Sequence, residues 1–567
     1  MTQPAIKTSS ERVFPLSTEA IKQNGPFAKS LSVVDATVLR YSPASATWLF
    51  DGSEGTHLSI DVLVLSLRRT LDSYPQWSGY LHMPIGNDHP SASVADHTKR
   101  FNRPMLTWGT SADPGVEVIQ AKSPHRLAEL IPSCEQRASR YRVWDGRVIA
   151  SMGIFPESPN LALYDRVTCD DLPCIIVQLT TFACGGLAIT VKLAHVLADA
   201  QTLLTFVHDW ATQNRWLVGG AKVEDVGIIE RPFQPELVNR AADGDIDVAI
   251  PDEKILAKAK SIPLHRYDWW ASTDDCPSFM LKSTEIPDAI KTNQSSLSFG
   301  KPMPWRQWDI LAPVSYYLVH FSREEVIAMW EASVTTTISQ SQTTTSSPPK
   351  ISKLDALFAH LWTLVIRARG LSQQDFDVHL DTTIGLRPRL SPPLPSHFIG
   401  SPIINIPVSL PASKVVGPNA ASAAAAAIRE SMNRYDSSTL ETLLYEMAYE
   451  VDPSRRWNTF LGERHTIATS WLESRPGMGI YDVDFGFGRR PRLAESLMPE
   501  CDGCIQVMES GVSNPKDVNE EISGATSRKF TPWYENGVAV SLHLRTDVMD
   551  KVLADTLLRR YDVFNNT

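Results

Sequence analysis

One histidine, His195, follows an apolar run and stands four residues before Asp199 in GLAITVKLAHVLADAQTLLTFV, residues 186–207. Because imidazole titrates near neutral pH, such a histidine can act as a general base, but it can equally be a hydrogen-bonded core residue. A chain with 14 histidines and 64 acidic residues should contain about one His-x-x-x-Asp spacing by chance. The spacing alone therefore does not decide between catalysis and packing.

The residues around His195 predict a strand before it and a helix after it. Residues 175–193 are rich in β-branched and aromatic side chains and are broken by Gly185–Gly186, which predicts a hairpin of two strands. Asp199 precedes apolar residues at helical spacing through Trp210, a position where aspartate commonly caps a helix. We therefore expect His195 at a strand-to-helix junction, where side chains often face a cleft.

The composition is that of a long, acidic, globular chain. Its 567 residues favour two large domains or two fused halves, and 43% hydrophobic with 21% charged residues is typical of a folded protein. A net charge of −10 argues against a nucleic-acid partner, which requires a basic face. The N-terminus, MTQPAIKTSSERVFPL, lacks a signal-peptide core, and no apolar run has the length of a membrane span. We expect a cytoplasmic monomer with no membrane partner.

The seven cysteines do not indicate a disulfide framework, because their number is odd and no signal peptide is recognised. Cys501 and Cys504 form one C-x-x-C, and without a second pair this pattern favours a loop with two free thiols over a zinc site. Cys184 lies in an apolar strand with no neighbouring base, so we do not expect it to act as a nucleophile.

Helical and extended patterns are mixed in both halves of the chain. Helical spacing is found within 57–81, in ISKLDALFAHLWTLVIRAR and in an Ala-rich stretch at 420–432. Between 216 and 310 the periodicity fades, and prolines and tryptophans predict a crossover whose tryptophans either anchor it locally or line a pocket. The low-complexity segment 334–349, VTTTISQSQTTTSSPP, predicts a disordered loop.

Three sequence segments, read together with this organisation, resemble the motifs of the BAHD acyltransferases. QLTTFACGGLAITVKLAHVLADAQTL is similar to the strand hairpin and H-x-x-x-D motif of that family, and GIYDVDFGFGRRP at 479–491 to its D-F-G-W-G block, with IATSWLESRP ahead of it. Weaker similarities are DTTIGLRPRLSPPLPSHFIGSP, HFSREEVIAMW and SKLDALFAHLWTLVIRAR. They occur in the family's order over about 30–555 and point to fungal members that acylate secondary metabolites, such as trichothecene acetyltransferases.

The sequence departs from the family pattern in three ways. Ala200 replaces the glycine that usually follows the histidine motif, and Phe487 replaces the usual tryptophan of the second motif. The chain is also longer than typical members, with the excess in the crossover, the Ser/Thr segment and 495–530. These differences leave the imidazole intact but weaken any assignment of a substrate by analogy.

The resemblance implies an α/β fold of two chloramphenicol-acetyltransferase-like sandwich domains, at 1–215 and 311–567, joined by a crossover at 216–310. The active-site channel is expected at their interface. There, the resemblance implies that His195 acts as general base while an acyl group is transferred directly from acyl-CoA to a hydroxyl or amine of a secondary metabolite. Acetyl is the first candidate for the acyl group. This transfer needs no metal.

The resemblance also implies roles for other motif residues. Asp199 is expected to cap a helix or pair with an arginine, and Asp484 to hold an arginine away from the chemistry. Gly486 and Gly488 are expected to allow a tight backbone path. Thr469 and Trp471 match positions that reach the active site in plant members, where a hydroxyl and an indole N–H can donate to the reacting oxygens, although both can also be ordinary strand residues.

Coenzyme A carries several phosphates, so an acidic protein needs local basic groups to bind it. The residues selected for this contact are Ser352, Lys353, Arg387 and Arg389, with Arg489 and Arg490 as further basic candidates. Ser352 is selected because its segment contacts the cofactor in some members of the family. Arg387 and Arg389 can instead be structural.

Two other functions stay open at this point. A free-standing condensation-type enzyme would use an acyl chain bound to a carrier protein, but such enzymes usually have two adjacent histidines, and Ala194 precedes His195 here. A non-catalytic scaffold with an acyltransferase-like fold is the second alternative, and the presence of His195 and Thr469 argues against it.

Overall fold

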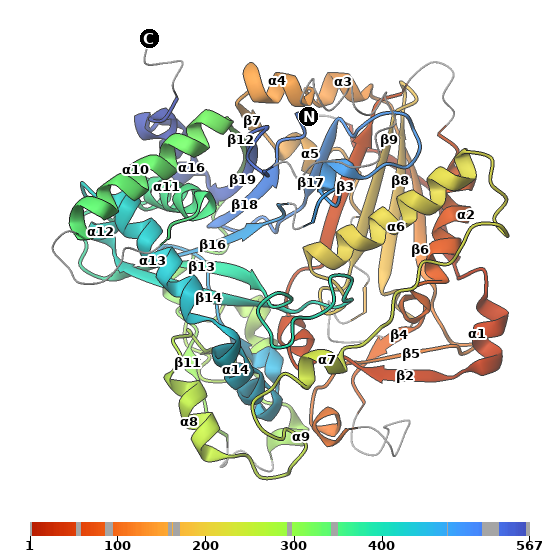
Figure 1. Cartoon of the computed structure of the whole chain (residues 1–567), viewed down its shortest axis with the longest axis horizontal. Coiled ribbons are helices and arrows are strands. Elements are labelled where there is room, and N and C mark those ends of the chain that lie inside the picture. The colour runs from red at the N-terminus through yellow and green to blue at the C-terminus, as the bar shows by residue number, and fades with distance from the viewer. Residues whose placement is uncertain are drawn as a thin grey trace.

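The computed structural model describes residues 3–52, 58–84, 95–156, 161–162, 171–291, 297–341, 350–472, 475–512 and 532–562. Two large β-sheets lie side by side, and helices pack on each of them (Figure 1). The mixed α/β class expected from the sequence is therefore confirmed.

The first large sheet has the strand order β1-β6-β8-β9-β3-β17. Its strands are β1 (Ile6–Val13), β3 (Ala44–Phe50), β6 (Val116–Ser123), β8 (Ile175–Phe182), β9 (Leu187–Leu193) and β17 (Leu493–Ser496). β8 and β9 form the antiparallel hairpin predicted from the sequence. Helices α2 (Ile60–Leu71) and α6 (Ala200–Val218) pack on each other and, with the sheet, enclose an apolar core around Trp48 and Trp210. This core fixes the direction in which α6 leaves His195.

The second large sheet has the strand order β14-β13-β16-β18-β19-β12-β7. Its strands are β7 (Val143–Asp145), β12 (Val314–Phe321), β13 (Asp377–Gly385), β14 (Ile403–Pro411), β16 (His465–Ser470), β18 (Cys504–Glu509) and β19 (Val538–Arg545). The helices that pack with it are α10 (Arg323–Ser341), α11 (Lys353–Ala368), α13 (Ala420–Arg434) and α16 (Thr546–Ala554). The predicted helix after residue 351 is present as α11, whose apolar face includes Phe358 and Trp362.

Each large sheet is completed by one strand from the other half of the chain. β17 pairs with β3, with Leu493 opposite Leu49, and β7 pairs with β12, with Asp145 opposite Tyr317. Because an unpaired sheet edge leaves backbone N–H and C=O groups without partners, each half supplies an edge strand to the other. The domain boundaries predicted at residues 215 and 311 divide the chain along its sequence. Each large sheet nevertheless includes one strand from the other side of these boundaries.

The crossover contains short elements and a buried group of tryptophans. Its elements are α7 (Glu236–Asn239), α8 (Glu253–Ser261), β10 (Tyr267–Asp268), α9 (Asp288–Lys291) and β11 (Lys301–Pro302), and β10 also pairs with β15 (Arg456–Trp457). Trp269, Trp270 and Trp305 are buried and pack with Phe460. They anchor the crossover to the second half, as one of the two interpretations of the sequence predicted.

The remaining described elements are short helices, 3-10 helices labelled η, and a small sheet of order β2-β5-β4. They are α1 (Thr18–Asn24), β2 (Phe27–Ser30), η1 (Asp35–Val38), η2 (Pro75–Ser78), β4 (Tyr80–His82), η4 (Asp96–Lys99), β5 (Met105–Trp108), α3 (Leu127–Leu130), α4 (Cys134–Ser139), α5 (Arg147–Ser151), η5 (Ser278–Thr284), η7 (Trp305–Gln307), α12 (Ala412–Val415), α14 (Ser437–Tyr449), η8 (Pro453–Arg455), η9 (Ile480–Asp482) and η10 (Thr556–Arg559).

The prediction of a disordered loop over 334–349 is wrong for its first half, because α10 continues to Ser341. Near the start of that segment the Ser333 hydroxyl donates to the Met329 carbonyl and the Thr335 hydroxyl to the Glu331 carbonyl, four residues earlier. Such bonds satisfy the hydroxyls within the helix, so the Ser/Thr composition does not end it. Residues 342–349 lie outside the described residues.

Phe206 offers a test of the core beneath α6. It is fully buried, and its ring meets the rings of Tyr74 and Trp77 edge-on, with a distance of 5.2 Å between ring centroids in both cases. We expect Phe206→Ala to destabilise the fold by about 3–5 kcal/mol, because it removes apolar contacts and leaves a cavity. Chemical denaturation followed by circular dichroism measures the effect. Phe299→Ala is the control, since Phe299 is exposed, and an equal loss in both variants would contradict this account.

Candidate active site

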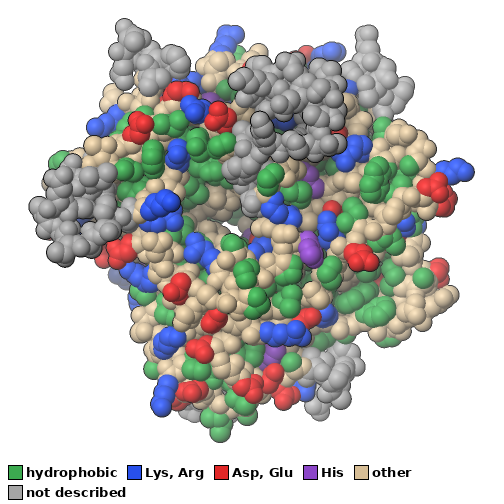
Figure 2. Space-filling model, viewed as in Figure 1, with side chains coloured by type: hydrophobic (Ala, Val, Ile, Leu, Met, Phe, Trp, Pro, Cys, Tyr) green, Lys and Arg blue, Asp and Glu red, His purple; other side chains and the backbone are tan. Residues whose placement is uncertain are grey.

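A cavity of about 1060 Å³ lies between the two large sheets. The start of β3 and the start of α6 contribute to its wall from the first half, and β13, β14 and β16 contribute from the second half. His195 is one of the lining residues. Figure 2 shows a hollow near the centre of the face in view, with Lys and Arg side chains close to it. The site that the sequence placed at the interface of two halves is thus built from both.

His195 stands between β9 and α6, at the expected strand-to-helix junction, and is half-buried. Its Nδ1 lies 3.2 Å from the Ser401 hydroxyl oxygen, and the Tyr41 ring meets the imidazole edge-on at a centroid distance of 5.5 Å. Burial lowers the pKa of His195 below its ordinary value, so the ring is neutral at neutral pH. If Nδ1 carries the proton that Ser401 accepts, the Nε2 lone pair is available to a substrate proton.

Ser401 is itself held by a buried carboxylate of the first half. Its backbone N–H donates to Asp35 Oδ1 at 2.7 Å, and the second oxygen of Asp35 accepts the backbone N–H and hydroxyl of Ser32. Burial raises the pKa of Asp35 to about 6. Sequence reasoning missed both Asp35 and Ser401. Ser401 is the second-last residue of the quoted segment DTTIGLRPRLSPPLPSHFIGSP, while nothing near Asp35 in the sequence indicates its role.

Asp199 both caps α6 and binds Arg387. Its Oδ1 accepts the backbone N–H of Thr202 at 2.9 Å and an N–H of Arg387 at 2.9 Å, and its other oxygen pairs with the same guanidinium. The Arg387 guanidinium also donates to the Thr202 hydroxyl at 2.7 Å. The structure therefore places Asp199 in the two structural roles considered for it, and its carboxylate binds the guanidinium rather than the imidazole.

The second motif supports the other end of α6. Asp484 forms an exposed ion pair with Arg215 at 3.1 Å and accepts the Gly486 N–H at 2.8 Å. Gly486 has a φ of +82°, and a Cβ on it would lie 3.1 Å from the Arg215 Cα. Gly488 also has a positive φ, of +66°. Only glycine adopts such backbone readily, so the two glycines let the motif turn closely against α6.

Thr469 and Trp471 both line the cavity. Thr469 lies near the end of β16, and Trp471 follows that strand, with its backbone N–H donating to the Val507 carbonyl at 2.9 Å. The structure thus brings both residues to the same cavity as His195, on the wall formed by the second half.

The four residues selected for coenzyme A have partners within the protein. Ser352 caps α11 by accepting the Asp355 N–H, and the Lys353 ammonium lies over the Trp330 ring at 4.4 Å. Arg389 donates to the carbonyls of Met432 and Tyr435, both at 3.1 Å.

Arg387 lines the cavity but is buried against Asp199, which matches the structural alternative stated for it. Contact of these four residues with the cofactor stays a prediction. Of the two further candidates, Arg489 donates to the Phe487 carbonyl at 3.2 Å, and Arg490 lies 3.8 Å from Asp482.

Arg475 was not selected from the sequence, although it lies in the quoted IATSWLESRP segment, and it lines the cavity. Its guanidinium donates to the Thr205 hydroxyl at 3.2 Å, while its Nε has no hydrogen-bond partner among the described residues. Burial, together with the positive charges of Arg231 and Arg387, lowers the pKa of Arg475. Among the described residues this guanidinium on the cavity wall is hydrogen-bonded to a hydroxyl and forms no ion pair with a carboxylate, although the charge of Asp209 also acts on it.

The cysteines of the described residues are free thiols. Cys501 and Cys504 line the cavity, and burial raises the pKa of Cys501 to about 11, so this thiol is protonated at neutral pH. Cys184 accepts the Leu127 N–H and is not among the residues that line this cavity.

Among the described side chains, His265, Asp381 and His465 form the one group with the types and spacing of a metal site. No helix in the described ranges has the length and apolar character needed to cross a bilayer.

The two motif aspartates allow a matched test, because each pairs with an arginine but only Asp199 is buried. We expect Asp199→Asn to cost about 3–5 kcal/mol of stability, since it leaves the Arg387 charge buried without its counterion. Asp484→Asn breaks an exposed pair and should cost less than about 1 kcal/mol. Thermal unfolding of both variants measures the difference, and similar melting temperatures would show that the buried pair does not support the fold.

Sequence and structure comparisons identify proteins that are similar to this chain. The profile of the Transferase family matches residues 157–225 and 325–522. Acyltransferase AFT15-1 of Alternaria alternata is 24% identical over 98% of this chain and 97% of its own length. Acyltransferase abl6 of Leptosphaeria maculans is 26% identical over 97% of each chain.

Solved structures share the fold. F. graminearum TRI101 complexed with coenzyme A and deoxynivalenol superimposes with a TM-score of 0.59 at 16% identity, covering 94% of this chain and 99% of that one. Vinorine synthase superimposes with a TM-score of 0.53 at 16% identity, covering 96% of both chains. The expected two-domain acyltransferase fold is confirmed by these neighbours. The motifs at His195 and Asp484 both lie within the segments that match the Transferase family profile, and the chain is similar to that family of acyltransferases.

Proposed function

We propose that this protein transfers an acyl group from an acyl-CoA thioester to a hydroxyl or amine of a secondary metabolite. Acetyl is the first candidate for the acyl group. The observation that carries the proposal is a neutral, half-buried His195 on the wall of a cavity built from both halves. The cavity, at about 1060 Å³, is at the upper end of the usual range for small-molecule sites, so it has room for a thioester and an acceptor together.

The chemistry requires one base and donors for an oxyanion. Nε2 of His195 takes the proton of the acceptor as its oxygen or nitrogen attacks the thioester carbonyl carbon. The tetrahedral intermediate then collapses, the C–S bond breaks, and the imidazolium returns the proton to the departing thiolate. The Thr469 hydroxyl and the Trp471 indole N–H lie on the same cavity wall and are suited to stabilise the oxyanion. Both reactants are bound together, so no acyl-enzyme forms.

The relatives support coenzyme A as the carrier of the acyl group. Two fungal relatives are named acyltransferases, and TRI101 structures contain coenzyme A with a trichothecene acceptor. Within this chain, Arg475 is the basic cavity residue whose charge lacks a carboxylate partner among the described residues, so it is suited to an anionic group of either reactant. The acetyl donor, the cytoplasmic location and the monomeric state stay predictions.

His195→Ala tests the proposal directly. Release of free thiol from acetyl-CoA is measured with a panel of alcohol and amine acceptors, and the variant should lose about 10²- to 10⁴-fold in kcat because the general base is missing. Ser401→Ala keeps the imidazole and removes only its hydrogen bond, so a loss of about tenfold or less is expected. Circular dichroism checks that both variants fold. Unchanged turnover in His195→Ala would remove the mechanism, and turnover only with an acylated carrier protein would identify a different donor.

The pH profile provides a second measurement on the same residue. The base acts in its neutral form, and burial lowers the pKa of His195, so protonation requires more acidic solution than for a free histidine. We therefore expect the acid limb of kcat to be centred below about pH 6.5, the ordinary pKa of histidine. An acid limb centred above pH 7 in the wild type would show that the buried-imidazole account is wrong.

A further inference from the structure

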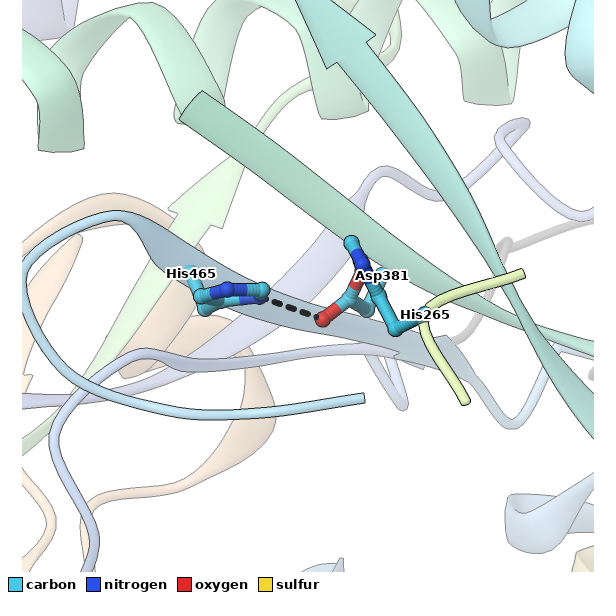
Figure 3. A group of neighbouring side chains, drawn as sticks. All are labelled: His265, Asp381 and His465. Carbon is cyan, nitrogen blue, oxygen red and sulfur yellow. Dashed lines mark hydrogen bonds and ion pairs between the residues drawn. The ribbon is translucent and has the colours of Figure 1, made fainter. Parts of the chain in front are cut away.

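Behind the cavity wall, three side chains from separate segments meet at one buried point (Figure 3). His265 precedes β10 in the crossover, Asp381 lies on β13 and His465 begins β16. Nε2 of His265 is 2.8 Å from Oδ1 of Asp381, and Nδ1 of His465 is 3.0 Å from Oδ2. Their exposed fractions are 6%, 0% and 1%, so the group is closed to bulk solvent.

The charge of the Asp381 carboxylate is not balanced by an arginine or lysine. Within the described residues its ion-pair partners are the two histidines alone. A buried carboxylate without a cation is costly. The cluster thus presents two imidazole rings and a carboxylate that has no arginine or lysine as an ion-pair partner among the described residues.

Further contacts orient the three groups. The Tyr267 hydroxyl lies 3.1 Å from Nε2 of His465, the ring nitrogen that faces away from Asp381. The Thr459 hydroxyl and the Phe460 N–H donate to Oδ2 of Asp381 at 3.0 and 3.1 Å. Metal-binding histidines and carboxylates commonly have such outer hydrogen bonds, which fix the tautomer and the ring plane.

We propose that His265, Asp381 and His465 form a structural binding site for a divalent transition-metal ion, with zinc as the best-fitting ion. Two imidazole nitrogens and a carboxylate oxygen form a zinc ligand set, whereas calcium and magnesium prefer oxygen alone. Zinc bonds to N and O are about 2.0–2.2 Å long, so ligands on one ion lie roughly 3 Å apart. The N–O separations of 2.8 and 3.0 Å are close to that spacing, and all the candidate ligand atoms lie within 4.8 Å of one another. A water molecule is expected to complete the coordination.

The position of the site indicates what the ion would stabilise. It connects the crossover, through His265, to the strands β13 and β16 of the second sheet. Thr459 and Phe460, which donate to Asp381, line the catalytic cavity. The ion would therefore hold the crossover against the cavity wall, and it takes no part in the transfer step.

The wild-type protein provides the first test. Protein stripped with a chelator is titrated with zinc chloride, with calorimetry for stoichiometry, thermal unfolding for stability and elemental analysis after dialysis. We expect about one zinc per chain and a higher melting temperature, because the ion binds the folded state. If no zinc is retained and the melting temperature does not change, the proposal is overturned. Neither readout depends on acyl transfer.

Variants and spectroscopy locate the ion. His265→Gln and Asp381→Asn should weaken zinc binding at least about tenfold. His360→Gln, which replaces a buried histidine on α11 outside the cluster, should bind like the wild type. If the two ligand variants do not fold, X-ray absorption of the zinc-loaded wild type decides. Nitrogen and oxygen neighbours with imidazole scattering support the site, whereas zinc–sulfur scattering, as from Cys501 and Cys504, would overturn it.

Discussion

The buried ion pair between Asp199 and Arg387 is the contact on which the candidate active site depends. Asp199 belongs to the first half, at the start of α6, and Arg387 follows β13 of the second half. Their charges are removed from water, and only close hydrogen bonding compensates for that loss. The carboxylate accepts from the guanidinium and from the Thr202 N–H, so one side chain both begins a helix and joins the two halves.

The pair is connected to His195, the proposed base, through a short backbone segment. The Gly400 carbonyl accepts the Asp199 N–H and the Thr202 hydroxyl, and the next residue, Ser401, meets Nδ1 of His195. Asp35 holds the Ser401 N–H from the opposite side. A base that must keep one tautomer needs a fixed partner for its other nitrogen, and this segment supplies it from the second half of the chain. The packing of the two halves therefore also sets the orientation of the His195 ring.

The sequence predicted those features that depend on neighbouring residues. The hairpin around Gly185, the cap at Asp199 and the helix that includes Trp210 follow from spacing within a few residues, and all three are present. Ser352 shows the limit of such reasoning. Its capping box with Asp355 follows from the local spacing, whereas its contact with the cofactor is implied only by resemblance and stays a prediction. The contact between Asp35 and Ser401 spans 366 positions, and that between Ser401 and His195 spans 206, so no local pattern indicates them. The same holds for β17, whose partner strand lies in the other half.

The charge of the cavity differs from that of the whole chain. The protein has a net charge of −10, but the described residues of the cavity wall include three arginines and one carboxylate. That carboxylate is Asp199, which Arg387 neutralises, and Arg475 binds the Thr205 hydroxyl. At physiological salt, charges on the outer surface are screened within about 8 Å, whereas charges inside a cavity are screened much less. An anionic reactant in this cavity therefore experiences the local arginines more than the acidic surface, which is how an acidic chain can bind an anionic cofactor.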